Sequence, residues 1–110
     1  MISKETMTTL NALYAYCRAG MVYICKDRND YLFQCPLHDK HVIRVYVSNG
    51  RGKWRCRGCR RGGDIFDLHA MLTGHECRSQ FRLVFKGLEQ ALKDIGYRDS
   101  SPLPAGRRDA

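Results

Sequence analysis

Two short pairs of potential metal ligands, separated by seventeen residues, constrain this chain more than any other feature. The first pair is Cys35 and His38 in the stretch CPLH, and the second is Cys56 and Cys59 in CRGC. A two-residue gap lets both members of a pair contact one metal ion, and the interval is long enough for a hairpin that returns the second pair to the first. Because Cys3His is a standard tetrahedral donor set, the spacing predicts one zinc ion held by these four residues.

The predicted zinc is structural, because a full Cys3His set leaves no open coordination position. Its binding also compensates for the modest core that a chain of 110 residues can bury. The alternative is that the cysteines are buried free thiols or form one redox-active pair. Two pairs at compatible spacing disfavour that interpretation.

Three further cysteines lie outside the two pairs. Cys17 and Cys25 fall on apolar stripes and are expected to be buried, whereas Cys77 has no assigned role. Cys25 is the rival ligand, since it lies one strand before Cys35. His41 also lies near the first pair, but His38 is favoured because it completes the two-residue gap.

The remaining two histidines are not expected to bind the metal. His69 is expected on a helix surface and His75 in a loop.

Hydrophobic periodicity and turn signals predict an α+β fold. It consists of a small zinc-ribbon-like antiparallel sheet of two hairpins, flanked by an N-terminal helix and two C-terminal helices. Residues 1–96 form one domain, and the polar, proline-containing segment 97–110 is predicted to be a disordered tail. The predicted elements are a helix over 4–19, strands over 22–25 and 31–33, strands over 42–47 and 53–56, a helix from the cap Asp64 to Gly74, and a helix over 79–95.

The N-terminal sixteen residues are polar, and no stretch approaches the length of a membrane-spanning helix. We therefore expect a cytoplasmic protein, in which thiols stay reduced and are available to a metal.

Basic residues are concentrated around the second ligand pair. The formal net charge is +8, which favours a polyanion as partner. Alternation along a strand places three of these cations on one face and turns Trp54 the other way, and the other three surround the metal loop. The six are Arg51, Lys53, Arg55, Arg57, Arg60 and Arg61.

These six cations are candidate contacts to single-stranded nucleic acid. Arginine donates paired hydrogen bonds to phosphate, and aromatic rings supply stacking surfaces for bases. One alternative is that the cations only compensate the negative charge of the zinc centre, but six cations are more than that charge requires. Another alternative is that they form a solvated face. The aromatic residues near this strip are Tyr31, Phe33, Tyr46 and Trp54.

The pattern C-x2-H-x17-C-x2-C followed by GGD resembles the zinc-binding domain of bacterial DnaG-type primases. YLFQCPLH and CRGCRRGGDIFDL carry the resemblance, which covers roughly residues 10–95. It implies a zinc ribbon flanked by helices, with Cys35, His38, Cys56 and Cys59 as the zinc ligands. It also implies binding to single-stranded template DNA. Gly62 and Gly63 are expected to allow the sharp turn from the metal loop into the next helix.

The resemblance implies a role in DNA replication priming but not polymerisation. Primases of this kind need an acidic, metal-binding catalytic domain, and the eleven acidic residues here form no paired-carboxylate motif. We therefore expect a non-enzymatic module that works in a primosome with a separately encoded polymerase, primase or helicase. Such a split arrangement would suit a mobile element.

Two other functions remain open at this stage. One is a protein-interaction adaptor or inhibitor that docks on a replication protein through an apolar patch of the last helix. The other is a small regulator that reads duplex DNA, although no helix-turn-helix is recognisable.

Overall fold

The computed structural model describes residues 2–38 and 40–97, and the predicted tail beyond Tyr97 lies outside the described residues. Tyr97 itself, the first residue of that predicted tail, is buried. The elements in chain order are α1 (Lys4–Met7), α2 (Leu10–Gly20), β1 (Tyr23–Asp27), β2 (Asp30–Gln34), β3 (Val42–Ser48), β4 (Arg51–Cys56), β5 (Arg61–Gly63), α3 (Ile65–Thr73) and α4 (Phe81–Asp94).

The five strands form one antiparallel sheet in the order β1-β2-β3-β4-β5. The second hairpin turns at Asn49 and Gly50, whose φ angles of 54° and 75° are those of the tight hairpin turn that an Asn-Gly pair favours. This turn pairs Ile43 with Cys56 at the far end of the two strands. The expected α+β class, with two hairpins and flanking helices, is confirmed.

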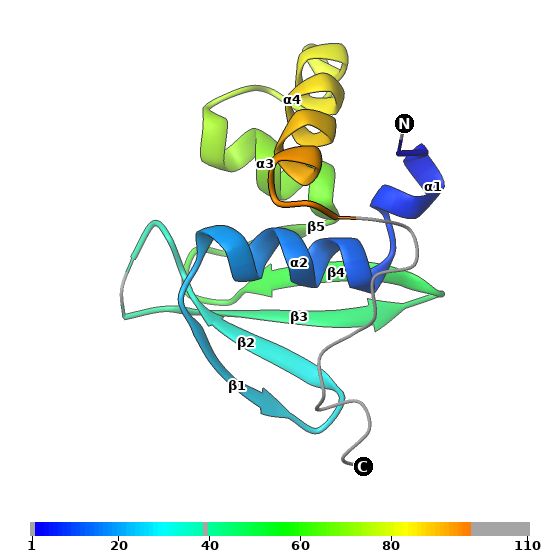
Figure 1. The fold of residues 1–110 in the computed structure, drawn as a ribbon. Helices are drawn as coiled ribbons and strands as arrows, with labels where there is room; N and C mark the ends of the chain where they lie inside the picture. Colours follow the sequence, from blue (N-terminus) through cyan, green and yellow to red (C-terminus); the bar gives the residue numbers. More distant parts are fainter. Residues whose placement is uncertain (1, 39, 98–110) are drawn as a thin grey trace.

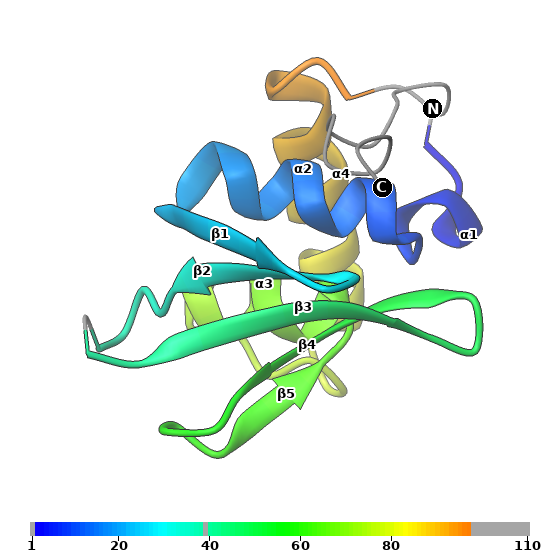
Figure 2. The same ribbon diagram turned by 90° about the horizontal axis from the view of Figure 1, so that it is seen from below.

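Helices α2 and α3 lie on the same side of the sheet (Figure 1), and the view in Figure 2 looks onto its other side. The fully buried residues Leu13, Phe33 and Val45 contribute to the core on the helical side. Tyr14 adds an aromatic contact there, with its ring centroid 4.8 Å from that of Tyr31. The sheet therefore has one buried face and one face that no described helix covers.

The predicted single helix over 4–19 is wrong in one respect, because the chain breaks it at Thr8 and Thr9. The Thr8 carbonyl accepts a hydrogen bond of 2.8 Å from the amide of Gly52 in β4, and the Thr9 side chain caps α2. A Cβ at position 52 would lie 2.9 Å from the Leu10 Cα. The break thus lets the start of α2 approach β4 closely.

Strand β5 was not expected from the sequence. Gly62 and Gly63, expected to allow a sharp turn into the next helix, also pair with Arg55 and Trp54 of β4, and Gly63 has a φ of 149° directly before the cap Asp64. Their lack of side chains matters, since a Cβ on Gly62 would lie 2.8 Å from the Trp54 carbonyl oxygen. Helix α3 follows directly, with Asp64 as its N-cap, as predicted.

His69 is buried, which contradicts the expected position on a helix surface. Its Nδ1 lies 2.6 Å from the hydroxyl of Tyr16 in α2, and a Cβ on Gly87 of α4 would lie 2.8 Å from its Nε2. Burial, with a smaller contribution from His75, lowers the pKa of His69 and so favours the neutral ring. Three helices therefore meet at the His69 ring.

This close approach predicts that Gly87→Ala destabilises the protein. An alanine inside a helix normally gains about 1 kcal/mol over glycine, but here the added methyl group would overlap a buried ring that is held by Tyr16. We expect a net loss of about 1–3 kcal/mol in the free energy of unfolding, measured by urea denaturation.

Gly20→Ala is the matched control, because a Cβ at the end of α2 meets no atom within 4 Å. It should be neutral or stabilising. Equal effects of the two substitutions would contradict the packing described for His69.

Candidate metal centre and basic face

The first ligand pair is held by a tight loop at the end of β2. The amide of Cys35 donates to the carbonyl of His41 at 2.9 Å, and the amide of His41 donates to the carbonyl of His38 at 3.0 Å. Burial raises the pKa of the Cys35 thiol, but hydrogen bonds from the backbone amides of Leu37 and His38, together with those from the thiols of Cys59 and Cys56, outweigh this and lower it overall. The loop is therefore built to stabilise a thiolate.

The second ligand pair lies in the turn between β4 and β5. Cys56 is the last residue of β4, and its register partner is Ile43 at the start of β3. The turn closes where the amide of Arg60 donates to the carbonyl of Arg57 at 3.3 Å, with Arg60 at a φ of 56°. Strand pairing thus brings this turn to the same end of the sheet as the first loop.

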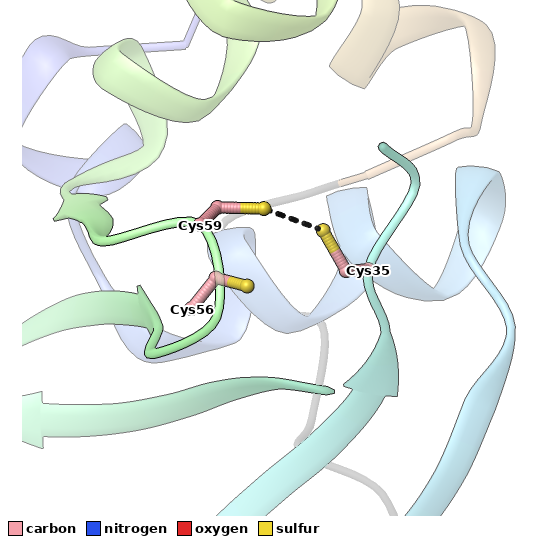
Figure 3. A group of neighbouring side chains, drawn as sticks. All are labelled: Cys35, Cys56 and Cys59. Atoms are coloured by element: carbon pink, nitrogen blue, oxygen red, sulfur yellow. Dashed lines mark hydrogen bonds between the residues drawn. The ribbon is translucent and has the colours of Figure 1, made fainter. Parts of the chain in front are cut away.

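The sulfur atoms of Cys35, Cys56 and Cys59 all lie within 4.8 Å of one another, and Figure 3 shows their side chains converging on one space. Cys35 Sγ and Cys59 Sγ are 3.6 Å apart, which is far too long for a disulfide. Two thiolates bound to one tetrahedral zinc ion would be about 3.8 Å apart. The three cysteines therefore form a zinc-binding cluster.

The electrostatics of the cluster also suit a cation. Burial raises the pKa of the Cys59 thiol to about 12, and the nearby sulfurs of Cys56 and Cys35 contribute to this rise. Three neighbouring thiolates repel one another, so a dication is needed to hold them all deprotonated. A thiolate-rich set of this kind selects zinc over the hard cations magnesium and calcium.

Two histidines border the cluster. Donor nitrogens of His38 and His41 lie within 4.8 Å of each other and of the Cys59 sulfur, and the two ring centroids are 4.8 Å apart. His38 is exposed, whereas His41 is half-buried with its Nδ1 3.4 Å from Cys59 Sγ. The predicted ligand His38 is thus brought to the cluster together with His41, which the two-residue spacing did not favour.

The other cysteines have separate environments. Cys17 is fully buried, as expected, but Cys25 is exposed on β1 and the expectation of burial was wrong. Among the described residues, Cys25 joins neither group of potential metal ligands. Cys77 is half-buried, and burial together with the carboxylate of Asp67 raises the pKa of its thiol.

The cations of β4 point away from the helices. Arg51, Lys53 and Arg55 alternate with the buried residues Gly52 and Trp54, so the predicted separation of Trp54 from the basic residues is confirmed. The three cations of the metal loop and β5 are exposed as well: Arg57, Arg60 and Arg61.

A cleft of about 540 Å³ lies on this open face beside the metal centre. Leu32, Val42 and Tyr46 supply its apolar and aromatic surface. Its cationic lining comprises two predicted contacts and two residues that the sequence analysis did not single out: Arg55, Arg57, Lys40 and Arg44.

Arg44 lies at the centre of the open face, between Leu32 and Arg55 in the strand register. Its guanidinium forms ion pairs with Asp30 at 2.8 Å and Asp27 at 3.1 Å, both in the β1–β2 hairpin. Its role was not recognisable from the sequence, because its position beside Arg55 depends on the β3–β4 register.

The expected set of stacking aromatics requires a correction. Tyr31 and Phe33 are buried on the helical side, contrary to this expectation. Trp54 is buried there too, in agreement with its predicted orientation away from the cations, and its indole donates to the Asp64 carbonyl at 2.7 Å. Of the four aromatic residues named from the sequence, Tyr46 alone is on the open face. Strand alternation is the cause, since residues one position apart face opposite sides.

Within residues 2–38 and 40–97, no helix has both the length and the apolar character needed to cross a membrane.

Comparison with known proteins agrees with this site. Searches of curated proteins and of solved structures found no match. The family model described as CHC2 zinc finger, a zinc ribbon of the DnaG type, matches residues 12–93. This match covers about three quarters of the chain and includes all the predicted ligands, so the protein belongs to the CHC2 zinc finger family.

Proposed function

We propose that this protein is a zinc-dependent module that binds single-stranded template DNA in replication priming. The observation that carries the proposal is the cationic cleft on the open face of the sheet, directly beside the cysteine cluster. Its volume of about 540 Å³ is within the range of about 300–1,000 Å³ typical of small-molecule sites. A cleft of this size suits one or two nucleotide units of a longer strand.

The chemistry of the cleft suits a single strand better than a duplex. Arg55 and Arg57 are positioned to donate to backbone phosphates, and Tyr46 offers a ring to an unstacked base. Leu32 and Val42 supply an apolar surface beside that ring. Paired bases inside a duplex would not present their faces to such a surface. Arg51, Lys53, Arg60 and Arg61 extend the cationic surface beyond the cleft.

In this proposal, zinc fixes the structure of the open face beside the cleft. Cys35, Cys56 and Cys59 supply three ligands, and we propose His38 as the fourth. Zinc then joins the β2–β3 loop to the β4–β5 turn, and these segments carry Lys40 and Arg57 of the cleft. The proposed partner is a separately encoded polymerase, primase or helicase, for which this module binds the template.

A second candidate function is supported by the opposite side of the molecule. An apolar groove of about 300 Å³ lies there, lined by residues that include Met21, Leu72 and Ile95. Leu72 and Ile95 are 38% and 41% exposed, which is high for large apolar side chains. An adaptor or inhibitor of a replication protein would dock through this groove and would not need the arginines.

The metal centre predicts that folding depends on zinc. Zinc contributes about 10–16 kcal/mol to small zinc domains, so chelation or Cys56→Ser should abolish the cooperative thermal transition followed by circular dichroism. Cys25→Ser is the matched control, since that exposed cysteine lies outside both ligand groups, and it should melt like the unmodified protein. A chelated protein that melts like the zinc-loaded protein would contradict a structural role for the metal.

The cleft predicts that the double variant Arg55→Glu/Arg57→Glu loses single-strand binding. Fluorescence anisotropy with a labelled oligonucleotide, repeated over a salt series, measures this. On a single strand, each phosphate contact adds about 0.7 to the magnitude of the negative slope of log K against log salt. The residual binding of the double variant should therefore show a slope smaller in magnitude by about 1.4 or more.

Arg78→Glu/Arg82→Glu is the charge-matched control. Both arginines are exposed on the helical side of the molecule, Arg78 just before α4 and Arg82 in its first turn. It should retain most of the binding. Equal losses in the two variants would show that only net charge matters. If the unmodified protein does not bind DNA, and Arg55→Glu/Arg57→Glu still binds a partner protein, the adaptor function would be favoured. Tighter binding to duplex than to single-stranded DNA would favour a duplex-reading regulator.

A further inference from the structure

We propose that His41 is a second histidine ligand of the zinc centre, able to complete the tetrahedron in place of His38. The inference rests on the cysteine cluster and the loop around it, and it does not depend on DNA binding.

The distances around Cys59 are those of ligand atoms that share one zinc ion. A thiolate and an imidazole nitrogen on the same tetrahedral zinc are about 3.5 Å apart, and two thiolates are about 3.8 Å apart. His41 Nδ1 lies 3.4 Å from Cys59 Sγ, and Cys35 Sγ lies 3.6 Å from the same atom. His41 and Cys35 thus stand at ligand spacing from a common neighbour.

The ring of His41 is held in this position by the second metal loop. A Cβ on Gly58 would overlap the His41 ring, so the ring occupies space that only glycine leaves free. The backbone of His41 is also fixed to the first loop, since its carbonyl accepts from the Cys35 amide at 2.9 Å. Its ring is half-buried against the cluster, whereas the ring of His38 is exposed.

Three thiolates leave one coordination position for two imidazoles. Both rings have a donor nitrogen within 4.8 Å of the Cys59 sulfur and of each other, but neither histidine joins the group of Cys35, Cys56 and Cys59. Exchange of one ring for the other as the fourth ligand therefore requires a movement toward the other two sulfurs. The exchange replaces one neutral imidazole with another and leaves the charge of the centre unchanged. His41 also lines the open-face cleft, so the choice of ligand decides whether the His41 ring is free beside the arginines.

Zinc affinity in a chelator competition tests this proposal with His38→Ala and His38→Ala/His41→Ala. If His41 binds the metal, the single variant should hold zinc at least about tenfold more tightly than the double variant. X-ray absorption at the zinc edge should show imidazole scattering in His38→Ala and none in the double variant. His38→Ala/His75→Ala is the control for loss of a second histidine, and it should behave like His38→Ala.

A further variant guards against misfolding as the explanation. Gly58→Ala keeps both histidines but removes the space for the His41 ring, so His38→Ala/Gly58→Ala should bind zinc as weakly as the double histidine variant. Equal zinc affinities of His38→Ala and His38→Ala/His41→Ala, with no imidazole scattering in the first, would overturn the proposal. These zinc assays contain no DNA, so their results do not depend on the proposed function. A protein that binds zinc through His41 but does not bind single-stranded DNA would contradict only the proposed function.

Discussion

The convergence of three cysteine sulfurs at one end of the sheet is the constraint on which the rest of the structure depends. The antiparallel register pairs Cys56 with Ile43, and that pairing brings the β4–β5 turn beside the loop that follows β2. A sheet this small buries too little apolar surface to fix its loops by packing alone. A metal at this point replaces packing that the chain is too short to provide.

The sheet divides the molecule into a side that supplies stability and a side that is available for recognition. Alternation along β4 places Trp54 in the core and Arg55 on the open face, so one strand serves both purposes. The helices cover only the apolar side. The stability of the core and the charge of the open face can therefore vary separately, because different residues of the same strands determine them.

Local patterns predicted much of the fold and part of the site, and long-range contacts account for what they missed. The Asn49-Gly50 turn and the cap Asp64 are local signals, so the second hairpin and α3 appear where expected. The break in the first helix depends on Gly52, which is far along the chain, and the burial of His69 depends on two other helices. Ligand spacing identified the cysteines, but it said nothing about where the ring of His41 would lie.

The ion pairs of Arg44 affect which ligands the open face would accept in the proposed function. At the middle of the face, Arg44 is already hydrogen-bonded to Asp27 and Asp30. A lone phosphate or a mononucleotide bound at Arg44 would compete with two carboxylates for its guanidinium and would gain few other contacts. A polymer that reaches Arg55 and Arg57 at the same time gains several contacts against the same cost. For the single strand proposed above, the acidic hairpin would therefore favour an extended strand over a small anion.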